Sequence, residues 1–290
     1  MSHILDGKRL AVIGDPIEHS LSPLIQQAML DELGVDCTYG RICVPAGTVS
    51  SWLPGAPELN LGGFNATMPH KTDLVPLMDT LSDDARMYRS VNTVVIRDGR
   101  FHGHNTDGEG FLRSLLDEGV NPKGRRVAVY GAGGAARSVV LKLAAEGAQS
   151  ITVCCRTPAK AAELTRASDR VQTVALHEKR FMERLEETDL FINCTPLGMH
   201  GVAAQFENFD FLDALPAGTP VCDLIYRPLK TALLTEAERR GHQTMNGLGM
   251  LIHQAILALE QFASQSLDRE RMKTAVRKAL LPALEHDRLR

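Results

Sequence analysis

Apolar positions recur along the chain with two different spacings. Short apolar runs such as RLAVIGD (9–15) are typical of buried strands, and stretches such as SPLIQQAMLDELG (22–34) carry apolar residues at helical spacing. From Arg125 onward the strand-like runs become regular: RRVAVYG, SITVCCR, RVQTVAL, DLFINCT and PVCDLIY. Such near-continuous apolar strands, alternating with helices, predict an α/β fold with parallel sheets and crossover helices.

Local signals mark the ends of several of these elements. Ser22 is predicted to be the N-cap of a helix that has Pro23 in its first turn and Gly34 at its end. Asp98-Gly99 predicts a hairpin turn between two extended segments. Lys71 follows a strand-like run and a proline, which predicts that it lies in the first turn of a helix, where a cation is disfavoured.

The pattern divides the chain into two α/β parts. Residues 125 to about 245 are predicted to form one dinucleotide-type domain, and roughly the first hundred residues form a smaller α/β unit. The segment between them, 108–119, itself carries a helical pattern. A helix in this position predicts two joined domains around a cleft.

Composition and charge narrow the class of protein. The chain of 290 residues is 44% apolar and 23% charged, and its formal net charge is -3, which gives no electrostatic case for binding nucleic acid or a membrane surface. No apolar run has the length of a membrane span or an export signal. The six cysteines lie mostly in apolar runs and are predicted to be buried, reduced thiols. We therefore expect a soluble cytoplasmic protein.

A glycine-rich loop opens the second part of the chain. Gly131, Gly133 and Gly134 directly follow a strand and precede a helix, and Ala136 stands where the fingerprint accepts glycine or alanine. In this context the loop predicts a pyrophosphate site at the helix N-terminus. The alternative is a tight strand–helix turn that binds nothing.

The strand after this loop indicates which dinucleotide binds. NAD sites usually carry Asp or Glu at the end of that strand, about 20 residues past the loop. Here the strand ends in Arg156 and Thr157, with no carboxylate, and a guanidinium and a hydroxyl suit a 2′-phosphate. The predicted cofactor is NADP.

Four short polar segments lie outside the nucleotide domain: HSLSP (19–23), NATMPHK (65–71), SVNT (90–93) and GHNTDG (103–108). Taken singly, each is explained equally well by turns and helix caps. Together they end strands or begin helices, where open α/β sheets gather ligand groups. His102 and His104 lack a third ligand at useful spacing, so we expect no metal.

These segments supply hydroxyls, amides, one lysine and one carboxylate, an inventory that suits a small polyhydroxylated acid. We expect a substrate carboxylate to be held by Ser20, Ser22 and Thr67, and ring hydroxyls by Asn65, Asn92 and Asp107. A Lys71–Asp107 pair could then exchange a hydroxyl proton while hydride leaves the same carbon.

At this point the chain resembles the shikimate dehydrogenase family. The matching motifs, in family order, are PIEHSLSP (16–23), NATMPHK (65–71), VNT (91–93), GHNTDGEGF (103–111), GAGGAA (131–136), CRTPAKA (155–161), NCTPLGM (193–199), DLIYRPLKT (223–231) and GLGMLIHQA (247–255). The resemblance implies a substrate domain over 1–107 with 246–290 and a Rossmann-like NADP domain over 108–245. It implies reversible reduction of 3-dehydroshikimate to shikimate in chorismate and aromatic amino acid biosynthesis, by a monomer or homodimer.

The resemblance also implies a role for individual residues. The catalytic pair is Lys71 and Asp107. The substrate shell is Ser20, Ser22, Asn65, Thr67, Asn92, Tyr226 and Gln254. The cofactor residues are Gly131, Ala132, Gly133, Gly134, Ala135, Arg156, Thr157 and Gly247.

Some positions depart from the family pattern and keep alternatives open. Gln26-Gln27 replaces His-Asn, Ala66 replaces valine, Cys155 replaces asparagine and Arg227 replaces asparagine. Two of these changes lie near substrate-binding segments, so a relative acting on quinate, an aminated shikimate or another hydroaromatic acid, with NADP or NAD, is the first alternative. A non-catalytic sensor of a hydroaromatic acid is the second.

Overall fold

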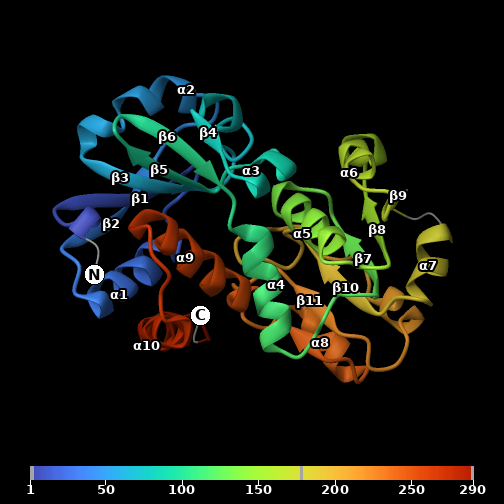
Figure 1. Cartoon of the computed structure of the whole chain (residues 1–290). Helices are drawn as coiled ribbons and strands as arrows, with labels where there is room; N and C mark the ends of the chain where they lie inside the picture. Colours follow the sequence, from blue (N-terminus) through green and yellow to red (C-terminus); the bar gives the residue numbers. More distant parts are fainter. Residues whose placement is uncertain (1–2, 177–178, 289–290) are drawn as a thin grey trace. The chain divides into compact units, whose positions relative to one another are not determined.

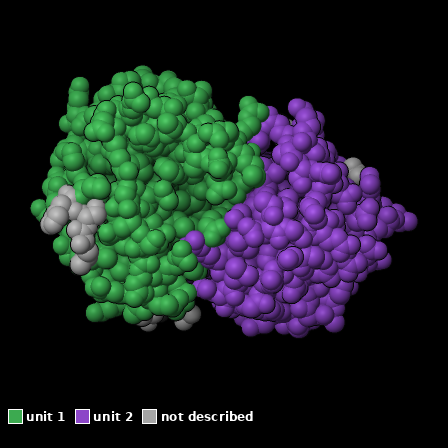
Figure 2. Space-filling view, in the orientation of Figure 1, with its two compact units in different colours: residues 1–110, 252–290 green, residues 111–251 purple. Residues whose placement is uncertain are grey.

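The computed structural model describes residues 3–176 and 179–288. The chain forms two compact units, which Figure 2 shows in different colours: unit 1 comprises residues 1–110 and 252–290, and unit 2 comprises residues 111–251. Each unit contains its own six-stranded sheet. Figure 1 labels the helices and strands of both units.

The sheet of unit 1 is mixed, in the strand order β2-β1-β3-β5-β6-β4. Its strands are β1 (Lys8–Gly14), β2 (Cys37–Cys43), β3 (Leu61–Ala66), β4 (Thr80–Leu81), β5 (Thr93–Arg97) and β6 (Arg100–His104). β1 pairs parallel with both β2 and β3, whereas β5 pairs antiparallel with β3 and with β6. The antiparallel β5–β6 pair is the hairpin predicted from Asp98-Gly99. The expectation of a parallel sheet is wrong for β3 and β5, which also pair antiparallel.

Helices cover this sheet and short 3₁₀ turns join its strands (Figure 1). The helices are α1 (Ser22–Leu33), α2 (Val49–Trp52), α3 (Asp83–Tyr88) and α10 (Arg269–Arg288); α4 (Asp107–Asp117) and α9 (Leu248–Ala263) each continue into unit 2. The 3₁₀ turns are η1 (His3–Leu5), η2 (Leu53–Gly55), η3 (Pro57–Leu59) and η4 (Val75–Leu77). Phe64, fully buried on β3, meets Trp52 edge-to-face with ring centroids 5.3 Å apart, so aromatic packing joins α2 to the sheet.

Of three predicted local signals, two are confirmed and one is wrong. The hairpin is confirmed: Asp98 and Gly99 have φ of 49° and 69°, as a primed turn requires. Gly34 ends α1 with a left-handed φ of 65°, as expected. Ser22 is not the N-cap, because the helix already includes it and the preceding residue is Leu21; instead the Ser22 amide donates to Ser20 Oγ at 3.2 Å.

The predicted helix at Lys71 is also wrong. Residues 68–74 form consecutive turns, and the next regular segment is the three-residue η4. No helix N-terminus is therefore available there to act on the lysine. The carbonyl of Lys71 accepts instead from the Val91 amide at 2.8 Å, so the loop is fixed by the segment before β5.

Unit 2 has a fully parallel sheet in the order β12-β11-β10-β7-β8-β9. Its strands are β7 (Arg126–Tyr130), β8 (Ser150–Cys155), β9 (Val171–Ala175), β10 (Leu190–Asn193), β11 (Val221–Asp223) and β12 (Thr244–Met245). Its own helices are α5 (Gly134–Ala145), α6 (Ala162–Ala167), α7 (Lys179–Leu185) and α8 (Ala232–Arg239), with 3₁₀ turns η5 (Pro158–Ala161) and η6 (Asp210–Ala214). Counted from β7, the strand order is 3-2-1-4-5-6, which is the Rossmann order predicted for a dinucleotide domain.

One buried carboxylate fixes the loops that follow β10 and β11. Asp223 is 1% exposed; its Oδ1 accepts from Asn193 Nδ2 at 3.0 Å and its Oδ2 from Thr231 Oγ1 at 2.7 Å. Removal from water disfavours the charged form, and this burial raises the pKa of Asp223 to about 6. The three residues thus tie the end of β11 to β10 and to the start of α8.

We expect Asp223 to make unfolding pH-dependent. Because its folded pKa of about 6 lies above its unfolded value, its contribution to stability is complete below about pH 4 and is lost as the pH rises through about 6. The loss amounts to about 3 kcal/mol. Asp223→Asn removes this titration, so its stability relative to wild type should rise between pH 4 and pH 7. Urea unfolding at several pH values measures the difference, and a difference that stays constant with pH would contradict the assignment.

Candidate active site

The polar segments HSLSP (19–23), NATMPHK (65–71), SVNT (90–93) and GHNTDG (103–108) belong to unit 1, and we call them the polar cluster of unit 1. β1 and β3 are parallel neighbours, so the loops that follow them leave the sheet at the same edge. The Thr67 amide donates to the Ile13 carbonyl at 3.0 Å. A Cβ placed on Gly14 would lie 2.6 Å from Thr67 Cγ2, so only glycine permits this approach. The segment NATMPHK is thereby held beside the end of β1, from which HSLSP continues.

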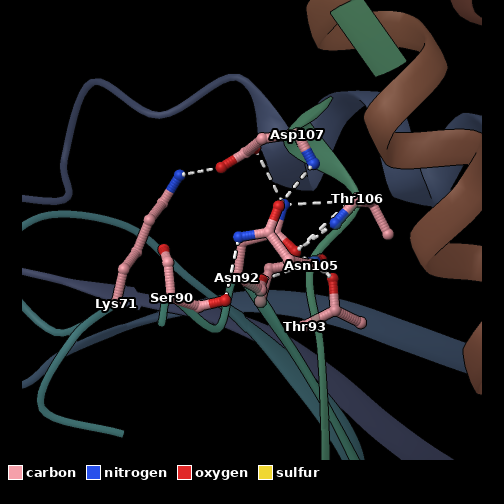
Figure 3. Close-up of polar contacts among 8 residues, drawn as sticks. Lys71, Ser90, Asn92, Thr93, Asn105, Thr106 and Asp107 are labelled. Carbon is pink, nitrogen blue, oxygen red and sulfur yellow. Dashed lines mark hydrogen bonds and ion pairs between the residues drawn. The ribbon is translucent and has the colours of Figure 1, made fainter. Parts of the chain in front are cut away.

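Lys71 and Asp107 form an ion pair in this cluster, although they lie 36 residues apart (Figure 3). Lys71 Nζ donates to Asp107 Oδ2 at 2.7 Å, and the side chains are 19% and 6% exposed. Lys71 comes from the turns after β3, and Asp107 is the first residue of α4. The two side chains predicted to act together are therefore in contact.

Asn92 holds the other oxygen of this carboxylate. Its Nδ2 donates to Asp107 Oδ1 at 2.8 Å and to Thr106 Oγ1 at 2.9 Å, and its Oδ1 accepts from the Thr106 amide at 2.9 Å. Figure 3 shows these contacts converging on Asn92. Both oxygens of Asp107 are thus occupied, one by an amide and one by an ammonium group, which fixes the plane of the carboxylate.

Asn105 orients the main chain at the start of α4, a role that the sequence did not reveal. Its Oδ1 accepts from the Asp107 amide at 3.0 Å and its Nδ2 donates to the Ser90 carbonyl at 2.9 Å. The GHNTDG motif contained this residue, but an asparagine two positions before a helix is usually explained as a turn residue. Its partner on the segment before β5 becomes visible only in the folded chain.

The remaining predicted substrate residues fall into both units. Ser20 and Ser22 are half-buried at the start of α1, and Gln254 lies on α9, where a Cβ on Gly110 would come 2.8 Å from Gln254 Cβ. Tyr226 belongs to unit 2, and burial raises the pKa of its hydroxyl. Asn65 is buried on β3, where its side chain contacts Tyr39 and Thr93.

The unusual glutamines after HSLSP make contacts within the fold. Gln26 is buried and its Nε2 donates to the Ala255 carbonyl at 3.0 Å, which links α1 to α9. Gln27 Oε1 accepts from the Tyr39 amide at 2.9 Å, which links α1 to β2. These contacts give both departures from the family pattern a packing role.

The glycine loop of unit 2 fits a dinucleotide. Gly131 has φ of 108°, and a Cβ there would lie 2.7 Å from Thr195 Cγ2, so both the turn and the contact require glycine. α5 begins at Gly134 with Gly133 as its N-cap, and a Cβ on either glycine would meet nothing within 4 Å. The free amides of this helix end can therefore be approached closely by a pyrophosphate.

The end of β8 fits a 2′-phosphate. β8 pairs with β7, and the register places Cys154 opposite Tyr130, directly before the glycine loop. Arg156 and Thr157 follow and are both exposed, whereas Cys155 is buried at 7%.

Gly247, the last predicted cofactor residue, has no room for a Cβ, which would lie 1.9 Å from the Leu224 carbonyl oxygen.

Three further expectations concern metals, thiols and membranes. In residues 3–176 and 179–288, no three His, Cys, Asp or Glu side chains gather as a metal site would require. The same part of the chain contains no helix that is both long and apolar enough to cross a membrane. The prediction that the cysteines are buried is wrong for Cys43, which is exposed at the end of β2; Cys194 is half-buried and the other four are buried.

Comparison with known proteins assigns both parts of the chain to one family. A family model described as "Shikimate dehydrogenase substrate binding domain" matches residues 12–94, and "Shikimate / quinate 5-dehydrogenase" matches residues 115–200. The shikimate dehydrogenase (NADP(+)) of Alkaliphilus metalliredigens is 37% identical over 273 residues, which cover 92% of this chain and 95% of the relative.

Solved structures share the fold. Shikimate 5-dehydrogenase from Thermus thermophilus, in complex with NADP(H) and shikimate, has a TM-score of 0.82 at 33% identity, with 94% of this chain and 100% of that chain covered. The enzyme from Listeria monocytogenes, in complex with shikimate and NAD, has a TM-score of 0.83 at 31% identity, with 92% and 95% covered. The predicted fold class, a substrate domain with a Rossmann-like domain, is confirmed. The chain belongs to the shikimate dehydrogenase family.

Proposed function

We propose that the protein is an NADP-dependent oxidoreductase acting on a CH–OH group, which interconverts shikimate and 3-dehydroshikimate in chorismate and aromatic amino acid biosynthesis. The observation that carries this proposal is the contact between Lys71 Nζ and Asp107 Oδ2 at 2.7 Å. A lysine and a carboxylate held together on a sheet edge supply a proton-transfer group, and a Rossmann unit in the same chain supplies the binding site for a hydride carrier.

The chain's own residues handle the proton and hold the substrate. NADP, when bound, supplies the hydride acceptor or donor. In the oxidation direction the Lys71–Asp107 pair takes the proton of the reacting hydroxyl, and in the reduction direction it returns that proton. Asn92 and Lys71 between them hold both oxygens of Asp107, so the carboxylate keeps one orientation in both directions.

The other roles follow the polar segments. The substrate carboxylate is held by hydroxyls of Ser20, Ser22 and Thr67. The ring hydroxyls are held by Asn65, Asn92 and Asp107, and Tyr226 and Gln254 complete the substrate shell. Residues 1–107 with 246–290 act as the substrate domain and residues 108–245 as the NADP domain. The loop from Gly131 to Ala135, with Gly247, receives the nucleotide.

Arg156 and Thr157 select NADP over NAD. Arg156→Ala is expected to raise the KM for NADP⁺ by about tenfold or more, because a charge-assisted bond to a phosphate is among the stronger polar contacts. The KM for NAD⁺ should change less than twofold, since NAD⁺ has no 2′-phosphate. Steady-state kinetics with both nucleotides test this, and an equal rise for both would mean that Arg156 holds some other part of the cofactor.

One experiment tests the function and its alternatives. Reduction of NADP⁺ and NAD⁺ is followed by absorbance with shikimate and with quinate as substrates. Activity highest with shikimate and NADP⁺ supports the proposal, and preference for quinate or another hydroaromatic acid supports the related activity. Binding of a hydroaromatic acid without turnover by either nucleotide would support a sensor and would overturn the dehydrogenase assignment.

Two finer expectations belong to this proposal. The enzyme acts as a monomer or a homodimer on a small hydroaromatic acid, and its location is cytoplasmic. Light scattering on the purified chain measures the first, and fractionation of cells of the source organism measures the second.

A further inference from the structure

A chain of buried hydrogen bonds leads from β2 to the Asp107 carboxylate. It begins at Tyr39, which is 6% exposed and belongs to none of the motifs described above. The Tyr39 hydroxyl lies 2.7 Å from Asn65 Oδ1 on β3. From Asn65 the chain continues to Thr93 on β5 and then to Asn92.

The orientation of the Asn65 amide is fixed by its neighbours. One end of this amide lies 3.1 Å from the carbonyl oxygen of Asn92, which can only accept a hydrogen bond. That end must therefore be Nδ2, and the end facing Tyr39 must be Oδ1. Tyr39 consequently donates its proton to Asn65, and burial raises the pKa of the Tyr39 hydroxyl well above its ordinary value, so the donor stays protonated.

The orientation of Asn92 is fixed in the same way. The backbone N–H of Thr106 can only donate, so the atom 2.9 Å from it must be Asn92 Oδ1. Asn92 Nδ2 then faces Asp107 Oδ1 at 2.8 Å. Between the two asparagines, the Thr93 hydroxyl accepts a hydrogen bond from Asn65 Nδ2 at 2.9 Å and donates one to Asn92 Oδ1 at 2.9 Å.

We propose that Tyr39 is a positioning residue for the reaction, acting through a chain of hydrogen bonds that runs in one direction: Tyr39 to Asn65, Asn65 to Thr93, Thr93 to Asn92, and Asn92 to Asp107. Each donor in the chain polarises the next, and the order admits no reversal because it is set by a backbone carbonyl and a backbone amide. The chain of hydrogen bonds holds Asn92 with Nδ2 toward Oδ1 of Asp107, which leaves Oδ2 for Lys71. This inference rests on the proposed function, in which Asp107 and Lys71 move the proton.

The chain also limits how these asparagines can meet a substrate. Both N–H groups of Asn92 and both lone pairs of its Oδ1 have partners, so a direct contact with a ligand replaces one of these bonds. Asn65 uses both N–H groups and one lone pair of Oδ1. The contact that Asn65 offers without rearrangement is therefore acceptance of a hydrogen bond, which suits a substrate hydroxyl.

The first test is Tyr39→Phe, which removes only the hydroxyl. We expect kcat for shikimate oxidation to fall about tenfold, because a small misplacement of a catalytic group is costly. The KM for NADP⁺ should stay within twofold. Tyr88→Phe, a change to another buried tyrosine of unit 1, is the matched control and should leave kcat unchanged. If Tyr39→Phe retains the wild-type kcat at a temperature well below its Tm, the proposal fails and Tyr39 only supports the fold.

The second test shows whether Tyr39 acts through Thr93. Thr93→Val keeps the side-chain volume and removes the hydroxyl, and we expect it to lower kcat at least as much as Tyr39→Phe; Thr93→Ser, which restores a hydroxyl, should recover part of that loss. In the Tyr39→Phe/Thr93→Val double variant, kcat should be no more than about twofold lower than in Thr93→Val alone, because Thr93→Val already interrupts the chain of hydrogen bonds. Fully multiplicative losses would overturn the proposal.

A measurement without turnover separates this inference from the proposed function. With selectively ¹⁵N-asparagine-labelled protein, Tyr39→Phe should shift the side-chain amide resonances of both Asn65 and Asn92, whereas Tyr88→Phe should not. If the wild type oxidises no hydroaromatic acid, the proposed function fails. The spectrum still decides whether the chain of hydrogen bonds from Tyr39 to Asp107 exists. Unshifted Asn92 resonances would overturn the inference whatever the activity.

Discussion

Lys71→Ala is expected to lower kcat for shikimate oxidation by ~10³-fold, because general acid–base groups typically contribute two to four orders of magnitude. The variant loses the amine that lies 2.7 Å from Asp107 Oδ2 in the cluster of unit 1. The residues proposed to bind the nucleotide belong to unit 2, so the affinity for NADP⁺ should stay within twofold. Steady-state formation of NADPH gives kcat and KM, and quenching of protein fluorescence by NADP⁺ gives its affinity.

Two control variants sharpen this result. Lys71→Arg keeps a positive charge beside Asp107, but a guanidinium does not give up its proton in proteins, so its kcat should stay close to that of Lys71→Ala. Lys179→Ala removes a lysine that is 90% exposed and should have no effect on kcat. If Lys71→Arg regains most of the wild-type kcat, or if Lys71→Ala raises KM without lowering kcat, Lys71 binds substrate and does not carry the proton.

Asp107→Asn is expected to lower kcat by a similar ~10²–10³-fold, for a reason that can be read from its contacts. Asn92 Nδ2 donates to one oxygen of Asp107 and Lys71 Nζ donates to the other. An amide in the same place must turn its own N–H₂ group toward one of these two donors. The variant therefore loses the negative charge and also loses one of the two bonds that orient it.

The matched control for Asp107→Asn is Asp83→Asn, which changes a carboxylate on α3 that is 99% exposed. Asp83→Asn should match the wild type in kcat and Tm. The Asp107→Asn/Lys71→Ala double variant should be hardly slower than either single variant, because residues that act as one unit are not additive. Losses that multiply would show that the two side chains serve separate steps.

The sequence predicted the Lys71–Asp107 contact correctly but for a partly wrong reason. Lys71 and Asp107 each follow a strand of the first domain, and residues in such positions gather at one edge of a sheet. This rule was sufficient to predict that the two side chains lie close together. The helix expected at Lys71 does not form, since residues 68–74 make consecutive turns. The Lys71 amine is held by Asp107, and the Lys71 backbone carbonyl is held by the Val91 amide before β5, so both contacts come from elsewhere in the chain.

Tyr39 and Thr93 show why part of the site could not be predicted. Tyr39 lies outside every motif, and Thr93 lies within SVNT (90–93) but received no role of its own, because tyrosine and threonine are both favoured in strands. Tyr39 meets Asn65 across β1, because β2 and β3 lie on either side of that strand. Thr93 meets Asn65 because β5 pairs with the other edge of β3 and the register places the two residues opposite each other. Such neighbours depend on strand order, which the local pattern does not contain.

The sequence by itself determined the regular features of this protein: the α/β alternation, the glycine loop before α5, the basic end of β8 and the chemical types of the groups proposed to be catalytic. These follow from short-range rules, since apolar spacing, turn residues and motif spacing act within about 20 residues. Only the tertiary structure decided the antiparallel pairing of β3 with β5, the direction of the Asn65 and Asn92 side-chain amides and the exposure of Cys43. These three features depend on which residues, far apart in the sequence, become neighbours. The pairing of strands across the whole unit determines those neighbours.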